Sequence, residues 1–318
     1  MTTFRTATRR WALSCVAGAL GCAAPAMATE TGGSDYPQGP EGFTAGALPP
    51  PGTYFLNYVE HYTAGRFNDG NGHAGFFPDF QVAATADVLR VVQVDKITVL
   101  GASVGHAVIL PVVDLSVGIG TAHDRRSGIG DMTLTPLILG WHGKSLHAVA
   151  ALDIYAPTGA YSQNRLANIG RNAWAAEPVL ALAYYPKGGF TVDVKLMYDF
   201  NGTNRQGNIN PLNPTGADYR SGQEFHADFA VGQQVGKVQL GVSGYVYRQT
   251  TGDKVANAAA QATLDALGGL KGKAFALGPS AHLNLGKVML IGTYQHEFQA
   301  DYRPQGDKFW VKAVIPLR

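Results

Sequence analysis

The sequence predicts an all-β fold, a single antiparallel transmembrane β-barrel of about twelve strands with long extracellular loops and short periplasmic turns. Three observations lead to this prediction. The chain begins with a segment that has the features of a secretory signal. Its later segments alternate between apolar and polar residues, and the connections between them alternate between long and short. Secreted chains with this pattern are typical of bacterial outer-membrane barrels.

The composition excludes several other classes of protein. The 318 residues are 46% hydrophobic and only 15% charged, which excludes an intrinsically disordered chain. No stretch beyond the N-terminus reaches about 18 uninterrupted apolar residues, so a polytopic helical membrane protein is excluded as well. The net charge of +2 comes without basic clusters, and we therefore expect no nucleic-acid partner.

Residues 1–28 are predicted to be a cleaved secretory signal. Three arginines in the first ten residues form a positive region, an uncharged Ala- and Leu-rich stretch follows, and Ala26-Met27-Ala28 is a small-x-small cleavage site. Cleavage near Ala28 would remove those three charges, which lowers the formal charge from +2 to −1, and would also remove both cysteines. The mature chain would then have no disulfide and no cysteine nucleophile. An uncleaved helical anchor and a lipoprotein signal at Cys22 are the alternatives.

Alternation is clearest over residues 190–201, where apolar and polar side chains take opposite faces. The alternating segments run for about 11 to 15 residues, which exceeds the five or six of a typical soluble strand. This length suffices for a tilted strand that spans a membrane. On this basis strands are predicted to begin near Thr53, Phe80, Ser103, Asp131, Leu146, Ala173, Phe190, Tyr219, Lys237, Ala274, Val288 and Lys308.

The connections between these segments differ in length in a regular order. Short turns are predicted at 142–144, 186–189, 235–237 and 284–287, and long polar loops at 63–79, 119–130, 158–171, 201–218 and 250–272. Within the last loop, Asp253 is predicted to cap a helix over Lys254–Leu267. Residues 53–318 are assigned to the barrel. The preceding residues 29–52 are rich in Gly and Pro and form either a periplasmic tail or a plug inside the lumen.

Aromatic residues near the predicted strand ends suggest interfacial girdles, as in other membrane barrels. The alternative is that strands simply favour aromatic side chains. The residues concerned are Tyr54, Tyr62, Trp141, Tyr155, Trp174, Tyr184, Tyr185, Tyr198, Tyr219, Tyr294 and Trp310.

One motif suggests an enzyme. Gly101-Ala102-Ser103-Val104-Gly105 matches the nucleophile elbow of serine hydrolases, which requires a helix directly after the serine. The residues that follow are β-branched and include Pro111, so they favour a strand. We therefore expect a turn and a strand at Ser103 and no catalytic residues.

Polar residues on the lumen side of the strands are the better functional candidates, because a charge that faces lipid is costly. His226 and Asp228 share a face but have no third ligand nearby, so we expect no metal site and no cofactor. The set forms either a structural network that fills the lumen or the lining of a permeation path. The candidates are Asp153, Glu177, Asp193, Lys195, Asp199, Arg220, Glu224, His226 and Asp228.

Several blocks of the chain together resemble the bacterial outer-membrane family named for the meta-cleavage pathway of phenol degradation. The blocks include Glu41-Gly42-Phe43, residues 45–52, Leu152-Asp153-Ile154-Tyr155-Ala156-Pro157-Thr158-Gly159, residues 195–201, residues 219–226 and residues 303–310. The resemblance implies an outer-membrane barrel with a transport role linked to aromatic breakdown, and it carries over no catalytic residues. The chain departs from outer-membrane barrels in general by ending in Pro316-Leu317-Arg318 and not in an aromatic residue.

The resulting hypothesis is a barrel in the outer membrane of a Gram-negative bacterium that passively admits small aromatic or hydrophobic compounds. Its partners would be outer-membrane lipid and that solute, and it would not be an enzyme. Two alternatives remain at this point: an outer-membrane ester or lipid hydrolase that uses Ser103, and a closed structural or adhesion barrel. The sequence determines neither the substrate nor the oligomeric state.

Overall fold

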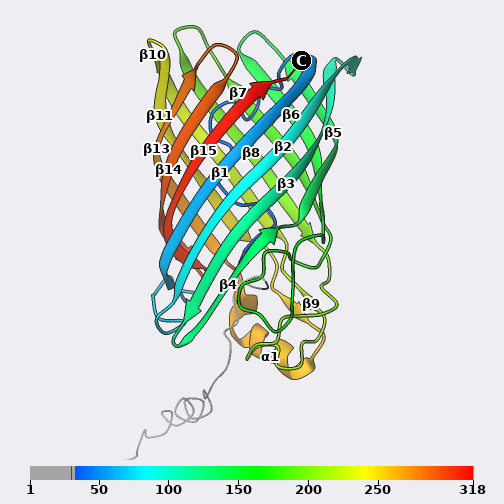
Figure 1. Ribbon diagram of the computed structural model, residues 1–318, viewed down its shortest axis with the longest axis vertical. Coiled ribbons are helices and arrows are strands. Elements are labelled where there is room, and N and C mark those ends of the chain that lie inside the picture. The colour runs from blue at the N-terminus through cyan, green and yellow to red at the C-terminus, as the bar shows by residue number, and fades with distance from the viewer. Residues whose placement is uncertain (1–29, 31–32, 318) are drawn as a thin grey trace, which may run out of the picture.

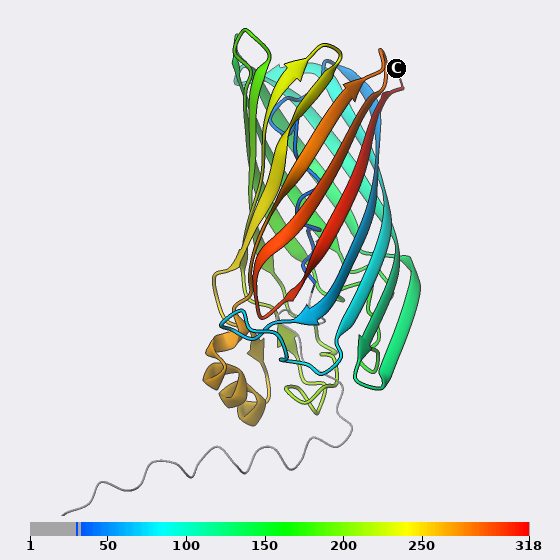
Figure 2. The same cartoon turned by 90° about the vertical axis from the view of Figure 1, so that its left-hand side faces the viewer.

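The structure, a computed structural model, describes residue 30 and residues 33–317; the predicted signal over residues 1–28 lies outside the described residues. Twelve long strands form a closed antiparallel barrel (Figures 1 and 2). They are β1 (Gly52–Phe67), β2 (Gln81–Val99), β3 (Ala102–Ile119), β5 (Met132–His142), β6 (Leu146–Ala156), β7 (Ala175–Tyr184), β8 (Phe190–Asn201), β10 (Glu224–Val235), β11 (Val238–Gln249), β13 (Lys273–Asn284), β14 (Met289–Asp301) and β15 (Pro304–Pro316).

Each strand pairs with its neighbours along the chain, and β1 pairs with β15 to close the ring. In the described chain, the five connections at one end are short, and five of the six at the other end are long or folded. The exception is the connection at 302–303. Both the first and the last strand have their free ends at the short-turn end. Closure leaves no unpaired edge, which a sheet in lipid requires.

The predicted strand count and most predicted strand starts are confirmed, but the strand expected from Tyr219 is wrong at its beginning. Tyr219 and Arg220 form the short strand β9 (Tyr219–Arg220), which pairs with β12 (Lys254–Val255) outside the barrel sheet. The barrel strand β10 begins only at Glu224. The Tyr219 hydroxyl and the Gly222 amide both donate to the Asp253 carboxylate, and this contact holds the segment in the loop region.

The predicted polar loop at 119–130 is also wrong. Strand β4 (Ala122–Ile129) pairs with the second half of β3, so these residues form a hairpin that extends beyond the barrel wall. On its outer face Arg125 makes two hydrogen bonds to Asp114 and Ser127 makes a third. Cross-strand pairs of opposite charge stabilise such a ladder, which explains why a polar sequence forms strands here.

The predicted helix in the last long loop exists but is shorter. Helix α1 (Ala258–Ala266) is capped by Asn257, whose side chain accepts from the amide of Ala260, and not by Asp253. The backbone of Gly268 and Gly269, in the 3₁₀ turn η2 (Gly268–Leu270), adopts positive φ angles that end the helical segment. No helix among the described residues is long and apolar enough to cross a membrane.

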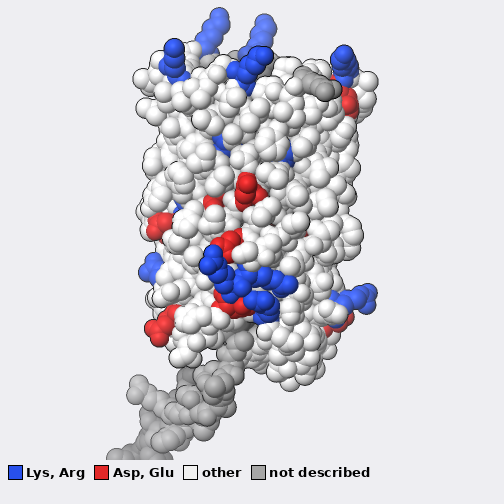
Figure 3. Space-filling model, viewed as in Figure 1, with Lys and Arg blue, Asp and Glu red and all other residues white. Residues whose placement is uncertain are grey.

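The face of the barrel drawn in Figure 3 is mostly uncharged in its upper half, and acidic and basic side chains gather together in its lower half. Outward residues such as Leu180, Leu182 and Phe200 are exposed, as lipid contact requires. Basic side chains stand at the short-turn end in Figure 3. Four of the short turns carry a lysine: Lys144, Lys187, Lys237 and Lys287.

The predicted aromatic girdle is correct only in part. Trp174, Tyr184 and Tyr294 are exposed on the outside. Tyr155 and Trp310 are buried inside the barrel, at 5% and 2% exposure. Their positions along β6 and β15 give them the inward phase of the alternation, which decides the face they occupy.

Candidate functional site

The lumen is occupied by residues 33–51, which run through the interior from the loop end to the short-turn end (Figure 2). We call residues 33–51 the inner segment. It has no regular secondary structure, so most of its polar groups need partners from the barrel wall. It passes close to β7, where a Cβ on Gly46 would overlap the backbone of Ala183. Glycine is needed there because the two backbones touch.

Asp228 on β10 is the first anchor of the inner segment. Its carboxylate accepts hydrogen bonds from the Tyr36 hydroxyl (2.6 Å) and from the backbone amides of Gly39 (2.9 Å) and Glu41 (3.1 Å). The Asp228 side chain is fully buried. A buried carboxylate is stable when several donors surround it, so Asp228 and the inner segment stabilise each other.

Glu41 of the inner segment is the second anchor. Its carboxylate accepts from the Tyr58 hydroxyl at 2.9 Å, forms an ion pair with Arg90 at 3.2 Å, and also binds the ammonium of Lys312. These partners come from β1, β2 and β15, on the other side of the lumen from Asp228. The inner segment is thus fixed to both walls.

The short-turn end of the lumen is closed by apolar packing. Ala45 and Leu48 of the inner segment pack against a buried cluster that includes Tyr54, Val94 and Ile138. Tyr54 also donates from its hydroxyl to the carbonyl of Pro50. The inner segment is thus packed against the barrel wall at this end as well.

A cavity of about 290 Å³ remains between the inner segment and the barrel wall. One wall consists of inward aliphatic side chains of β2 and β3, among them Val88, Ile109 and Val113. Charged side chains also line the cavity, among them Arg90 on β2 and Lys195 on β8. Such a cavity, mostly apolar with a few polar groups, is the usual form of a small-molecule site.

Two donors that line this cavity have no hydrogen-bond partner within the described residues, the Nε of Arg90 and the indole Nε1 of Trp310. The Lys195 ammonium lies 4.4 Å from the centre of the Tyr36 ring, in a cation–π contact. Lys195 is nevertheless buried, at 8% exposure. The lining of the cavity therefore combines buried polar groups with its apolar surface.

Eight of the nine predicted lumen residues are buried on barrel strands; the exception is Arg220, which is exposed in β9. The prediction for Arg220 is wrong because β9 lies outside the barrel. Asp193 accepts from the Tyr185 hydroxyl at 2.7 Å, and the Asp153 carboxylate accepts from the Thr135 hydroxyl. His226 contacts Asp199, while Asp228, which was predicted to share its face, holds the inner segment.

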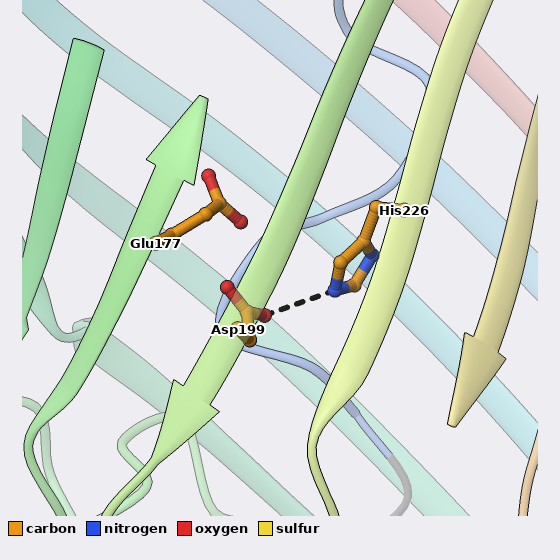
Figure 4. A group of neighbouring side chains, drawn as sticks. All are labelled: Glu177, Asp199 and His226. Carbon is orange, nitrogen blue, oxygen red and sulfur yellow. Dashed lines mark hydrogen bonds and ion pairs between the residues drawn. The ribbon is translucent and has the colours of Figure 1, made fainter. Parts of the chain in front are cut away.

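Figure 4 shows Glu177, Asp199 and His226 converging from three neighbouring strands. The imidazole Nε2 of His226 lies 2.9 Å from Asp199 Oδ2 and 3.3 Å from Glu224 Oε2. All four side chains are almost completely buried. This cluster is the densest group of carboxylates that the predicted lumen residues form.

Sequence reasoning missed Glu41, Arg90, Lys308 and Lys312 as lumen residues. A signal for Lys308 and Lys312 was present, because the apolar residues of β15 alternate with them. Lys308 donates to the carbonyl of Gln38 at 3.0 Å. Glu41 had no such signal, since the inner segment has no periodicity.

Ser103 is the second residue of β3, which follows the turn at Leu100 and Gly101 and continues to Ile119. The helix that a nucleophile elbow requires is not there. The motif is a tight turn followed by a strand, as the β-branched sequence predicts.

Comparison with solved structures finds the same fold in a bacterial outer-membrane channel. The chain is similar to the COG4313 outer membrane channel from Pseudomonas putida F1, with a TM-score of 0.73 and 18% identity, over 86% of this chain and 98% of that one. Weaker matches include the β-domain of the Bordetella autotransporter BrkA, with a TM-score of 0.45 and 10% identity over 84% of this chain and 100% of that one. Another is a Pseudomonas aeruginosa FadL homologue, with a TM-score of 0.40 and 9% identity over 84% and 90%. At these identities the comparisons establish the fold alone.

No curated protein matches the sequence. A family model matches residues 64–313, which is most of the barrel, and agrees with the resemblance seen in the sequence blocks. The chain therefore belongs to the family described as "Putative MetA-pathway of phenol degradation".

Proposed function

We propose that this protein is an outer-membrane channel that admits small aromatic or hydrophobic solutes by passive diffusion, after cleavage of its signal near Ala28. The cavity of about 290 Å³ carries this proposal. An apolar cavity of roughly 150 Å³ in another protein holds benzene, so this one has room for a substituted aromatic ring. The structural similarity to an outer membrane channel and the family membership support it.

In this proposal the lumen residues have two roles. Asp228 holds the inner segment, together with Glu41 and Lys312. Lys195 and Arg90 lie beside the solute and interact with its polar substituent. The protein performs no chemistry on the solute, and its lipid partner is the outer membrane.

The test is uptake into liposomes that contain the purified protein. Benzenesulfonate is the suitable probe, because its permanent charge slows diffusion through the lipid itself while its ring still fits the cavity. We expect uptake well above that of protein-free liposomes, and slower uptake of a sugar of similar size that lacks the ring. Equal benzenesulfonate rates with and without protein would refute the channel.

A closed structural barrel is the second candidate, and the apolar cluster around Leu48 at the short-turn end favours it. It predicts no uptake of either solute. The liposome assay distinguishes the two functions, because only the channel takes up benzenesulfonate.

A further inference from the structure

Four carboxylates form a row across neighbouring strands at the loop end of the lumen. Asp153 on β6 lies directly opposite Glu177 on β7, and Asp199 on β8 lies directly opposite Glu224 on β10. The register between β7 and β8 places Glu177 opposite Asp199 and completes the row. Like charges directly opposite each other destabilise a sheet, so either bound protons or a bound cation must offset the charge of this row.

The described part of the chain does not offset that charge through ion pairs with lysine or arginine. All four carboxylates are buried; His226 is the basic side chain in direct contact with them, while Lys195 and Arg303 act on Glu177 and Glu224 from a longer distance. One imidazolium would balance at most one carboxylate, and an uncompensated buried charge strongly destabilises a fold.

Three oxygens in the row have no hydrogen-bond partner among the described residues: Glu177 Oε2, Asp199 Oδ1 and Glu224 Oε2. One ligand atom each from Glu177, Asp199 and His226 lies within 4.8 Å of the others. His226 Nε2 is 2.9 and 3.3 Å from its two carboxylate neighbours. Ligand atoms bound at about 2.1 Å to one metal ion are separated by roughly 3.0 to 3.4 Å, so these distances suit metal ligation.

We propose that Glu177, Asp199, Glu224 and His226 together bind one first-row divalent cation, such as Zn²⁺. One imidazole nitrogen with carboxylate oxygens is a ligand set that such cations accept. The cation neutralises the row and ties β7, β8 and β10 together. This cation site goes beyond the proposed channel function, because solute passage does not depend on the bound cation.

The surroundings hold the His226 ring in place. Its centre lies 5.8 Å from that of Tyr36 and 5.2 Å from that of Tyr247. Its Nδ1 lies 3.3 Å from the Gln38 side-chain amide. The Gln38 amide is itself held by two other contacts, since its nitrogen donates to the carbonyl of Tyr36 at 2.7 Å and its oxygen accepts from Arg303 at 3.3 Å.

The test uses the full mature barrel in detergent, stripped with chelator and equilibrated with Zn²⁺ at pH 7.5. Elemental analysis after desalting should find about one Zn²⁺ per folded barrel. Glu177→Gln and Asp199→Asn keep the side-chain shape but remove the charge, and each should weaken Zn²⁺ affinity by at least tenfold in calorimetry. Bound Zn²⁺ should also raise the temperature at which the barrel loses its folded gel mobility.

The matched control is Asp193→Asn, since Asp193 is equally buried on β8 but is engaged by Tyr185. It should leave Zn²⁺ binding unchanged. Wild-type protein that retains far less than one Zn²⁺ per barrel overturns the proposal, and this measurement does not depend on how well any variant folds. Equal loss of binding in the control overturns it too, because the binding is then not specific to the row.

Discussion

At the scale of single residues, inward polar side chains decide what fills this barrel. Asp228 shows how: three donors of the inner segment converge on one buried carboxylate. Hydrogen bonds to a charged group contribute about 1.5–3 kcal/mol each, so a single residue accounts for much of the free energy with which the segment is held.

Asp228→Ala should therefore release the inner segment while the barrel stays folded. The variant leaves three donors without an acceptor and weakens the docking of the inner segment by about 3 kcal/mol or more. This corresponds to an increase of roughly 100-fold in the equilibrium constant for local opening. Hydrogen exchange measured by mass spectrometry should show this acceleration at Gly39 and Glu41. Asp114→Ala, which removes a carboxylate on the outer face, is the control, and unchanged exchange in Asp228→Ala would contradict the anchor.

At the scale of secondary-structure elements, β9, β12 and α1 form a cap at the loop end that is organised by Asp253. This carboxylate accepts from the Gly222 amide at 2.8 Å and from the Gln249 side chain at 2.7 Å, and it binds the Tyr219 hydroxyl. Burial raises the pKa of Asp253 from 3.8 to about 7, although these hydrogen bonds oppose the shift. The protonated carboxyl is therefore the form that the folded cap favours.

The stability of the cap should fall as the pH rises from about 4 through 7, because the unfolded loop gives up the Asp253 proton more readily than the folded one. The three-unit shift corresponds to at most roughly 4 kcal/mol. Asp253→Asn imitates the protonated carboxyl and should remove the dependence of cap stability on pH. The measurement is the ratio of wild-type to variant cleavage rates within α1, which should be higher at pH 8 than at pH 5. A ratio independent of pH would rule out this coupling.

At the scale of the whole molecule, the barrel and the inner segment are two parts with different roles. The barrel is closed by main-chain hydrogen bonding around the ring, so it is rigid. The inner segment is held by side chains and seals the short-turn end with Leu48 and its neighbours. A channel built this way opens when the segment moves and the wall does not.

A disulfide between the two parts tests this directly, because the predicted mature chain has no other cysteine. A Cβ on Gly42 would lie 3.7 Å from the Cβ of Ala230, within the range of natural disulfides. Oxidised Gly42→Cys/Ala230→Cys should lose most benzenesulfonate uptake and regain it on reduction. Each single variant serves as a control. Full uptake in the oxidised form would mean that solutes pass beside a fixed segment.

Much of the fold could be predicted from the sequence, because the alternation of apolar and polar residues is visible within each strand. Alternation with period two shows which residues share a face, and it put Lys195, Asp199 and Asp228 on the face that the structure buries. Alternation gave wrong predictions where the pairing of strands depends on residues far apart in the sequence. Arg220 continues the alternation but pairs with Lys254 in the cap, and residues 122–129 form a strand only because β3 extends to meet them.

The candidate site was less predictable, because it is made by segments far apart in the sequence. His226 seemed to lack a third ligand, since Glu177 and Asp199 approach it only through the strand register. The cavity needs a wall from β2 and β3 and a second wall from the inner segment. No periodicity in residues 33–51 indicated where that segment lies.

The sequence by itself determined an all-β chain, a barrel of about twelve strands and many of the side chains that face inward. These properties can be read from strand periodicity and loop length within short stretches of sequence, because every barrel strand has one face toward lipid and the other toward the lumen. Only the tertiary structure decided that residues 33–51 fill the lumen and that Arg220 lies outside it. It also decided that four carboxylates share one row. Those outcomes depend on register and on contacts between distant segments, which no local pattern specifies.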